Sequence, residues 1–257
     1  MRSESGIRSD GVKAGSYVGA YMEIELKYLL RDPEEIDRIF GDPAIQRMKD
    51  ETEVLPMHAV YFDTEDRKLA RERIAFRVRK EGDRYIATLK WSQEQREAGE
   101  LYRREELNVP VSDEEMIRAP KVSLFDTSPM EDRLKQLAGD APLTPLMEMT
   151  FVRRQTRVDT GDSISELSID RGDILAGGKT APILELELEL LSGSEEDVMN
   201  LGSRLAEKYD LIPGVKSKFE RGMDLYGPDQ DGPDRDGASP ENTEGRASEP
   251  GYLVFHR

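Results

Sequence analysis

The chain of 257 residues contains no cysteine. This absence excludes a disulfide framework, a thiolate metal site and a cysteine nucleophile. Histidine is almost absent as well, because only His58 and His256 are present, and this argues against a histidine-ligated metal centre. Any metal chemistry in this protein must therefore depend on carboxylate oxygens.

Long apolar segments are also missing. The sequence has no run of about 18 apolar residues that would span a bilayer, and its N-terminal segment lacks the apolar core of a secretory signal. Acidic residues outnumber basic ones by 53 to 37, and the formal net charge of −16 argues against nonspecific binding to nucleic acid or to an anionic membrane. We expect a soluble, cytoplasmic protein that binds neither nucleic acid nor membrane.

The two ends of the chain differ in composition from the middle. Residues 1–20 are rich in Gly and Ser without periodicity, so we expect a flexible leader. Residues 227–257 are rich in Pro, Gly and acids and have too few apolar residues to offset the entropy lost on ordering, so we expect an acidic disordered tail. One folded domain remains over residues 21–226.

Apolar and polar residues alternate in much of this domain, which predicts strands. The alternating runs cover residues 22–30, 57–62, 73–80, 84–91, 101–109, 148–158, 164–170 and 182–191. The sequence shows no βαβ rhythm and no Gly-rich phosphate loop after a strand, so we expect an α+β fold built on a mainly antiparallel sheet. If that sheet closes, about eight strands make a barrel that is filled by side chains or holds one small ligand.

Three helices are predicted by their start signals. Asp32-Pro33-Glu34-Glu35 combines an acidic N-cap, a proline and a capping-box glutamate, and Ser128-Pro129-Met130-Glu131 repeats this arrangement before a helix that should stop at Gly139. Ser194 precedes three acids that suit the first turn of a helix, whose last turn holds Lys208. We expect these helices to pack against the sheet.

Two strand segments carry rows of acids, Glu23-Ile24-Glu25-Leu26-Lys27 and Glu185-Leu186-Glu187-Leu188-Glu189-Leu190. A strand turns successive side chains to opposite faces, so each segment has one apolar and one charged face. If the two strands are neighbours, their carboxylates form an oxygen-rich site for a hard divalent cation such as Mg²⁺. The alternative is an ordinary antiparallel sheet with one face in water, which gives the same alternation.

Basic residues occupy single strand faces in the same way. Such positions are Arg77 with Arg79, Arg153 with Arg157, Lys216 with Lys218, and Lys90 at the end of a run. Each alone is typical of a solvated face or a cross-strand ion pair. Together with the carboxylate rows, however, they would hold a metal and a polyanion, and polyphosphate is the natural candidate.

The order of these motifs resembles the CYTH domain, also called the triphosphate tunnel metalloenzyme superfamily. The first acidic segment matches its N-terminal ExExK signature. The further matching motifs are Tyr61-Phe62-Asp63-Thr64, Ile74-Ala75-Phe76-Arg77-Val78-Arg79, Ala87-Thr88-Leu89-Lys90, Leu167-Ser168-Ile169-Asp170-Arg171-Gly172, Leu184-Glu185-Leu186-Glu187-Leu188-Glu189-Leu190 and Ser217-Lys218-Phe219-Glu220-Arg221-Gly222. The resemblance covers residues 22–226, and the ordered succession is specific although each motif alone is weak.

The resemblance implies a fold and a set of site residues. The fold is an eight-stranded closed antiparallel β-barrel, a tunnel with a charged lining and with helices packed outside. The metal ligands implied for one or two Mg²⁺ or Mn²⁺ ions are Glu23 and Glu25, Glu185 and Glu187 across the tunnel, and Asp170. The residues implied to hold the triphosphate are Lys27, Arg77, Arg79, Lys90, Arg153, Arg157 and Lys218. Glu23, Glu25, Lys27, Arg77 and Arg79 are the predicted catalytic residues, and Glu105, Glu166, Glu189 and Lys216 are further candidates near the site.

The activity implied by the resemblance is metal-dependent hydrolysis of a small-molecule triphosphate. Family members differ in their reaction, which is hydrolysis of inorganic tripolyphosphate, thiamine triphosphate or nucleoside triphosphates, or cyclisation of ATP. A polyphosphate-binding module without turnover is the non-enzymatic alternative. Trp91 either stacks on a base or thiazole or is an ordinary packed aromatic. Because no residues clearly form a pocket for such a group, we favour hydrolysis of inorganic tripolyphosphate to pyrophosphate and phosphate. A homodimer is left open.

Overall fold

The computed structural model describes residues 18–92 and 99–227. The leader and tail predicted from the sequence lie outside these residues, except for residues 18–20, which open the first strand, and residue 227. The strands are β1 (Val18–Leu29), β2 (Glu53–Asp63), β3 (Ile74–Glu81), β4 (Arg84–Trp91), β5 (Tyr102–Val111), β6 (Thr144–Asp159), β7 (Ser163–Ala176), β8 (Lys179–Gly193) and β9 (Ile212–Pro213). The helices are α1 (Glu35–Phe40), α2 (Pro43–Met48), α3 (Lys68–Arg71), α4 (Glu114–Arg118), the 3₁₀ helix η1 (Val122–Phe125), α5 (Glu131–Ala138), α6 (Glu195–Tyr209) and α7 (Lys218–Asp224).

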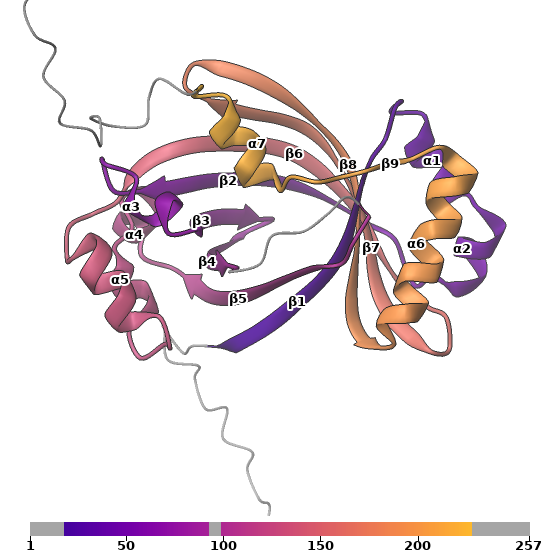
Figure 1. The fold of residues 1–257 in the computed structure, drawn as a ribbon, viewed down its shortest axis with the longest axis horizontal. Coiled ribbons are helices and arrows are strands. Elements are labelled where there is room, and N and C mark those ends of the chain that lie inside the picture. The colour runs from indigo at the N-terminus through magenta and orange to yellow at the C-terminus, as the bar shows by residue number, and fades with distance from the viewer. Residues whose placement is uncertain (1–17, 93–98, 228–257) are drawn as a thin grey trace, which may run out of the picture.

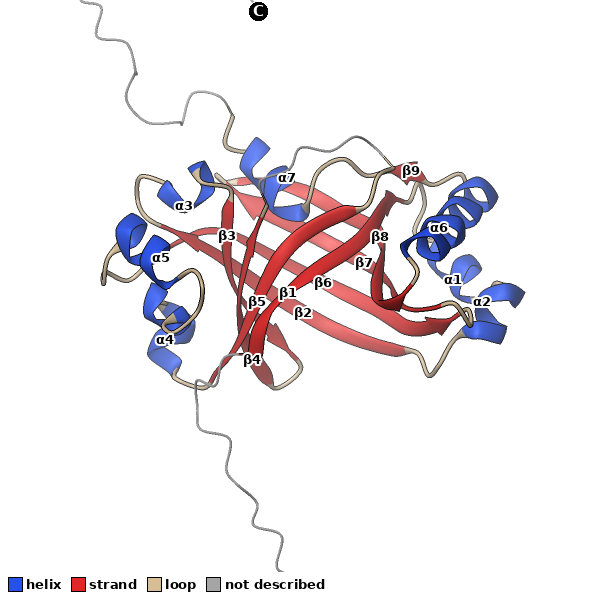
Figure 2. Cartoon of the chain, turned by 60° about the horizontal axis from the view of Figure 1, so that its bottom comes forward, coloured by secondary structure: helices blue, strands red, loops and turns tan. Residues whose placement is uncertain are grey.

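The strands form one closed antiparallel barrel (Figures 1 and 2). Their order is β5-β4-β3-β2-β6-β7-β8-β1, and β1 also pairs with β5, which closes the sheet. The two-residue strand β9 pairs with the end of β1. The predicted eight-stranded barrel with helices outside it is confirmed.

Every predicted strand is present, but the strands of the β6-β7-β8 meander are longer than the sequence pattern suggested. For example, β6 runs over Thr144–Asp159, where alternation predicted residues 148–158. The far end of β6 lies against α2, and α6 packs on β7 and β8. The added length therefore provides a surface on which helices pack.

The three predicted helices are also present, but α1 and α5 start later than predicted, and α5 begins at Glu131 with Met130 rather than Ser128 at its N-cap. Ser194 caps α6 by accepting a hydrogen bond from the Asp197 backbone N–H, and α5 stops before Gly139, whose φ of 64° favours glycine. In contrast, α1 begins at Glu35, because the Asp32 carboxylate accepts a hydrogen bond from the Glu34 backbone N–H at 2.8 Å and forms a turn before the helix. The start signal was correct in type but early in position.

The hydrophobic core lies on the outside of the barrel, in two separate clusters. In the first, α1, α2 and α6 cover the outward leucines of β1, β7 and β8, including Leu26, Leu167 and Leu188. In the second, α3, α5 and η1 cover β3, β4 and β5, where Phe76 and Leu89 are fully buried. Figure 1 shows these helices at opposite ends of the barrel. Because each buried Leu or Phe contributes about 1.5–3 kcal/mol, the outer clusters hold the fold and leave the interior free for polar groups.

A third apolar cluster lies on the inward face of the barrel beneath α7, which crosses the top of the barrel in Figure 1. The ring of Phe219 lies 5.3 Å from that of Tyr61, and α7 begins with a capping box formed by Ser217 and Glu220. A Cβ at Gly222 would lie 2.3 Å from the Met147 sulfur, so a larger residue at this position would require the Met147 side chain to move. These contacts fix α7 against the inside of the barrel.

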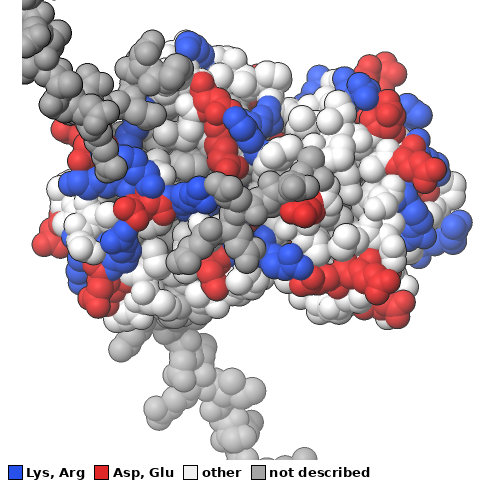
Figure 3. All heavy atoms as spheres, viewed as in Figure 1, with Lys and Arg blue, Asp and Glu red and all other residues white. Residues whose placement is uncertain are grey.

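The outer surface carries charges of both signs. On the face shown in Figure 3, Lys and Arg side chains are interspersed with Asp and Glu rather than gathered in one basic patch. No helix in the described ranges has the length and apolar character needed to cross a membrane.

Candidate active site in the tunnel

Strand alternation places the charged rows inside the barrel, where they line a cavity of about 270 Å³. Nine of the predicted site residues line it directly: Glu23, Glu25, Lys27, Arg77, Arg79, Lys90, Arg153, Glu187 and Lys218. Asp170 and Glu185 are fully buried and contact two of these lining residues, Arg153 and Lys218. The structure therefore brings together all the predicted site residues except Arg157.

The two acidic strands β1 and β8 are neighbours. Lys27 is paired with Glu187 and Glu25 with Glu189 in the antiparallel register. The two acidic rows were expected to face each other across the tunnel, with Glu185 and Glu187 opposite Glu23 and Glu25. This expectation was wrong, because hydrogen bonding between β1 and β8 sets the two rows side by side on one wall.

Asp170, Glu185 and Glu187, here called the carboxylate triad, form a compact buried group. One oxygen from each lies within 4.8 Å of the others. Although burial disfavours their charged forms, Arg153 and Lys218 hold the pKa of Asp170 below its usual value, and Lys218, Lys27 and Arg153 hold that of Glu187 well below. Asp170 and Glu187 of the triad are therefore ionised at neutral pH.

The donor set of the triad fits a hard divalent cation. All its ligand atoms are carboxylate oxygens, which Mg²⁺ and Mn²⁺ prefer. Nearby basic groups compensate the negative charge, which makes so many buried carboxylates tolerable.

Glu23 and Glu25 form a second acidic group together with Glu106. Lys90 lies 2.6 Å from both Glu23 and Glu106, and Arg104 donates hydrogen bonds to Glu23 at 3.0 Å and to Glu25 at 2.8 Å. Burial raises the pKa of Glu25, and the charges of Glu23 and Glu187 add to this effect. In Glu23, burial is outweighed by Lys90 and Arg104, which lower its pKa.

Lys27 joins the second acidic group to the triad. Its ammonium lies 2.8 Å from Glu187 and 3.5 Å from Glu25. The five predicted metal ligands thus form two adjacent groups with a buried lysine between them.

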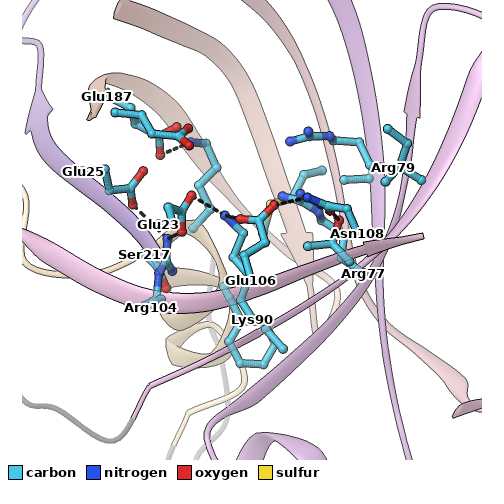
Figure 4. Close-up of a pocket in the computed structure, with 18 of the residues that line it drawn as sticks. Glu23, Glu25, Arg77, Arg79, Lys90, Arg104, Glu106, Asn108, Glu187 and Ser217 are labelled. Atoms are coloured by element: carbon cyan, nitrogen blue, oxygen red, sulfur yellow. Dashed lines mark hydrogen bonds and ion pairs between the residues drawn. The ribbon is translucent and has the colours of Figure 1, made fainter. Parts of the chain in front are cut away.

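The opposite side of the cavity is basic. Figure 4 shows Arg77 and Arg79 across the cavity from Glu23, Glu25 and Glu187. Both arginines are buried, and within the described residues the Nε–H groups of Arg77, Arg79 and Arg104 donate no hydrogen bond. Burial, together with the charges of Arg77 and Arg153, lowers the pKa of Arg79. Since unpaired buried donors are costly, this side of the cavity suits an anionic ligand.

Arg104, Glu106 and Asn108 on β5 also line the cavity, and sequence reasoning missed them. Glu105, a further candidate near the site, instead lies on the opposite face of the strand, between the lining residues Arg104 and Glu106. The outward alternation of Leu107, Val109 and Val111 could have fixed this parity.

The remaining predicted residues lie in different surroundings. Glu166 and Glu189 line the cavity, and burial with the charges of Glu23 and Glu25 raises the pKa of Glu189 to about 8. Arg157 is exposed on β6 opposite Glu166, and its role in substrate binding stays a prediction. Lys216 is exposed and pairs with Asp224, so it does not share a strand face with Lys218, which opens α7.

Residues 22–223 match the model of the CYTH domain family. This chain belongs to the CYTH domain family. It is 30% identical over 162 residues to the inorganic triphosphatase of Haemophilus influenzae, covering 63% of this chain and 44% of the relative. The chain therefore spans less than half the length of that curated relative.

The fold is also shared with a solved structure. A putative adenylyl cyclase from Hippeastrum, described as having a dominant triphosphatase activity, superposes with a TM-score of 0.62 at 22% identity, over 79% of this chain and 96% of that chain. A putative adenylate cyclase from Bacillus halodurans gives a TM-score of 0.49 at 20% identity, over 79% of this chain and 98% of that chain. The first of these likenesses supports the tunnel fold.

Proposed function

We propose that this CYTH protein is a metal-dependent triphosphatase that hydrolyses inorganic tripolyphosphate to pyrophosphate and phosphate. The proposal rests on one observation above all: a cavity in which buried carboxylates face the guanidinium groups of Arg77 and Arg79. Such an arrangement suits a metal-bound polyanion, because the acids hold the cation and the bases hold the phosphates. The inorganic triphosphatase activity named for the Haemophilus influenzae relative supports it.

In this proposal the basic side of the cavity binds and orients the triphosphate. The unpaired Nε–H groups of Arg77 and Arg79 donate to phosphate oxygens, and Lys90 and Arg153 supply further positive charge. In phosphoryl transfer the charge on the transferred group is stabilised mainly by such fixed cations. The loss of one preorganised donor costs about 3 kcal/mol of transition-state stabilisation in a site that excludes water.

The acidic side would hold the metal. The triad and Glu25 supply the oxygen ligands, and a divalent cation held there contributes charge neutralisation and lowers the pKa of a bound water. Glu23 is held in its charged form by Lys90 and Arg104, so the second acidic group keeps its negative charge at neutral pH.

Inorganic tripolyphosphate is favoured over a triphosphate with a base or thiazole because Trp91, the candidate for stacking on such a group, does not line the cavity. Trp91 packs against the second outer cluster, on the face of β4 opposite to Lys90 and Thr88. The ordinary packed position expected as the alternative for this residue is the one observed.

The test is phosphate release from tripolyphosphate, thiamine triphosphate, ATP and pyrophosphate, each with Mg²⁺, Mn²⁺ or chelator. Glu25→Gln is compared with Glu105→Gln, which changes a carboxylate on the outer face of the barrel. We expect metal-dependent release from tripolyphosphate that falls by at least about 100-fold in Glu25→Gln and is retained in Glu105→Gln. Equal activity of the two variants would contradict the site, and release from another triphosphate alone would contradict the substrate.

A further inference from the structure

The ammonium group of Lys218 lies among the three carboxylates of the triad. It contacts one oxygen of each: Oδ2 of Asp170 at 2.8 Å, Oε1 of Glu187 at 2.9 Å and Oε1 of Glu185. Lys218 is itself buried, with 8% of its surface exposed. A single positive charge thus takes the central position of the triad.

Arginines bind the outer sides of the same carboxylates. Arg153 donates to both oxygens of Asp170 and to Oε2 of Glu187, each at 2.8 Å, while Arg221 donates to Oε2 of Glu185 at 3.0 Å. Arginine keeps its charge at any ordinary pH, and its planar group is held by paired contacts. Of the three oxygens that face Lys218, Oδ2 of Asp170 is shared with Arg153 and Oε1 of Glu187 with Lys27, while Oε1 of Glu185 faces Lys218 without a second ion pair in the described residues.

A divalent cation and the Lys218 ammonium cannot occupy this position together. A Mg²⁺ ion needs oxygens at about 2.1 Å, so an ion bound to the three inner oxygens would overlap an ammonium that lies about 2.8 Å from them. We propose that Lys218 competes with the divalent cation for the triad, an inference that rests on the proposed function. Lys218 neutralises the three carboxylates until the cation displaces it, and its ammonium then turns into the cavity to meet the triphosphate.

The position of Lys218 suits this exchange. It is the first residue of α7, whose start is fixed by the capping box of Ser217 and Glu220, so only the side chain has to move. A lysine carries a compact charge on a flexible four-carbon stem, unlike the rigid fork of Arg153. Lys218 also lines the cavity, which places its ammonium within reach of a bound ligand.

Competition predicts that one substitution changes two affinities in opposite directions. Lys218→Met removes the one positive charge that contacts all three carboxylates and frees Oε1 of Glu185, so the divalent cation binds more tightly in the absence of triphosphate. The same change removes a positive charge from the cavity, so tripolyphosphate binds more weakly in the presence of the cation. A lysine that only bound substrate would change the second affinity and leave the first unchanged.

The experiment measures the dissociation constant of Mn²⁺ for the full chain by the EPR signal of free Mn²⁺, without triphosphate. Lys27→Met is the matched control, because Lys27 is also buried and lies 2.8 Å from Oε1 of Glu187, but forms an ion pair with this one carboxylate of the triad rather than with all three. We expect Lys218→Met to lower the Mn²⁺ dissociation constant by at least about tenfold and Lys27→Met to lower it less. An unchanged or raised constant in Lys218→Met, or equal gains in both variants, would overturn the proposal.

Thermal melting keeps the result interpretable if Lys218→Met is less stable. In chelator the variant should melt below the wild type, because three carboxylates lose a counter-charge, and saturating Mn²⁺ should raise its melting temperature by more than that of the wild type. An equal or smaller gain would refute competition. If the wild type releases phosphate with metal but Lys218→Met binds Mn²⁺ no more tightly, the competition is refuted and the proposed function stands. Tighter Mn²⁺ binding by the variant without any phosphate release would refute the proposed function alone.

Discussion

Replacing Arg104 with Ala removes the guanidinium that holds Glu23 and Glu25 together at the centre of the tunnel. Arg104 is 16% exposed, and its two carboxylate partners are 5% and 3% exposed. After the change Glu23 keeps Lys90 at 2.6 Å, but among the ion-pair partners of Glu25 in the described residues only the more distant Lys27 remains, at 3.5 Å. The variant therefore leaves a buried carboxylate with too little positive charge.

Breaking a buried ion pair in this way costs about 3–5 kcal/mol. In a folded unit of this size, 1 kcal/mol lowers the melting temperature by about 2–4 °C, so Arg104→Ala should lower it by about 6–20 °C. The loss should shrink in acid, because burial raises the pKa of Glu25 and a neutral carboxyl needs no counter-charge.

The neighbouring Arg103→Ala is the matched control. Arg103 lies on the outer face of the same strand, is 41% exposed and pairs with the equally exposed Glu195. Exposed pairs contribute about 0–1 kcal/mol, so this variant should melt close to the wild type. Thermal unfolding followed by circular dichroism, in chelator and over a range of pH, measures both. Equal losses in the two variants would refute the argument that the tunnel arginine compensates buried acids.

Three further outcomes are expected. Glu189→Gln should flatten the pH dependence of stability in chelator. The folded pKa of Glu189 is about 8 and exceeds the ordinary 4.5, so the wild type loses stability as pH rises between these values, by up to about 1.4 kcal/mol per pH unit. Urea unfolding measures this, and an equal change of unfolding free energy between pH 5 and pH 8 in the two proteins would contradict it. Leu188→Ala, at a fully buried outward position, should cost about 2–5 kcal/mol, and a smaller loss in urea unfolding would count against the outer core. Removing residues 228–257 should leave phosphate release intact, because the cavity lining runs from Tyr21 to Phe219; lost release from a folded truncated protein would assign the tail a role.

Most of the barrel and much of its lining could be predicted from the sequence, because leucines and charges alternate strictly in strands such as β8. In Glu185-Leu186-Glu187-Leu188 the apolar residues mark one face and the acids the other. On β5, by contrast, residues 103–106 are all charged, so the parity of this stretch follows only from Leu107, Val109 and Val111 further along the strand. The central residues Arg104 and Glu106 were missed for that reason.

Pairing between distant segments could not be read from periodicity. Alternation shows which face of β8 is charged but not which strand lies beside it, so the adjacency of Glu187 and Lys27 required the three-dimensional register. Likewise, Lys216 and Lys218 are two residues apart, a spacing that suits a strand, yet the capping box at Ser217 starts a helix there and turns Lys218 alone into the tunnel. Local helix capping outweighed the strand-like spacing at this point.

Separating the hydrophobic clusters on the outside from the charges inside also bears on how such a protein can change during evolution. Residues such as Leu188 and Phe76 pack in the outer clusters, whereas Arg77, next to Phe76 on β3, and Glu106 on β5 line the tunnel. Substitutions within the lining can therefore alter ligand preference while the packing that maintains the barrel stays in place, provided that the balance of buried charges is kept. One scaffold can in this way be adapted to new anionic ligands by exchanging alternate residues along its strands.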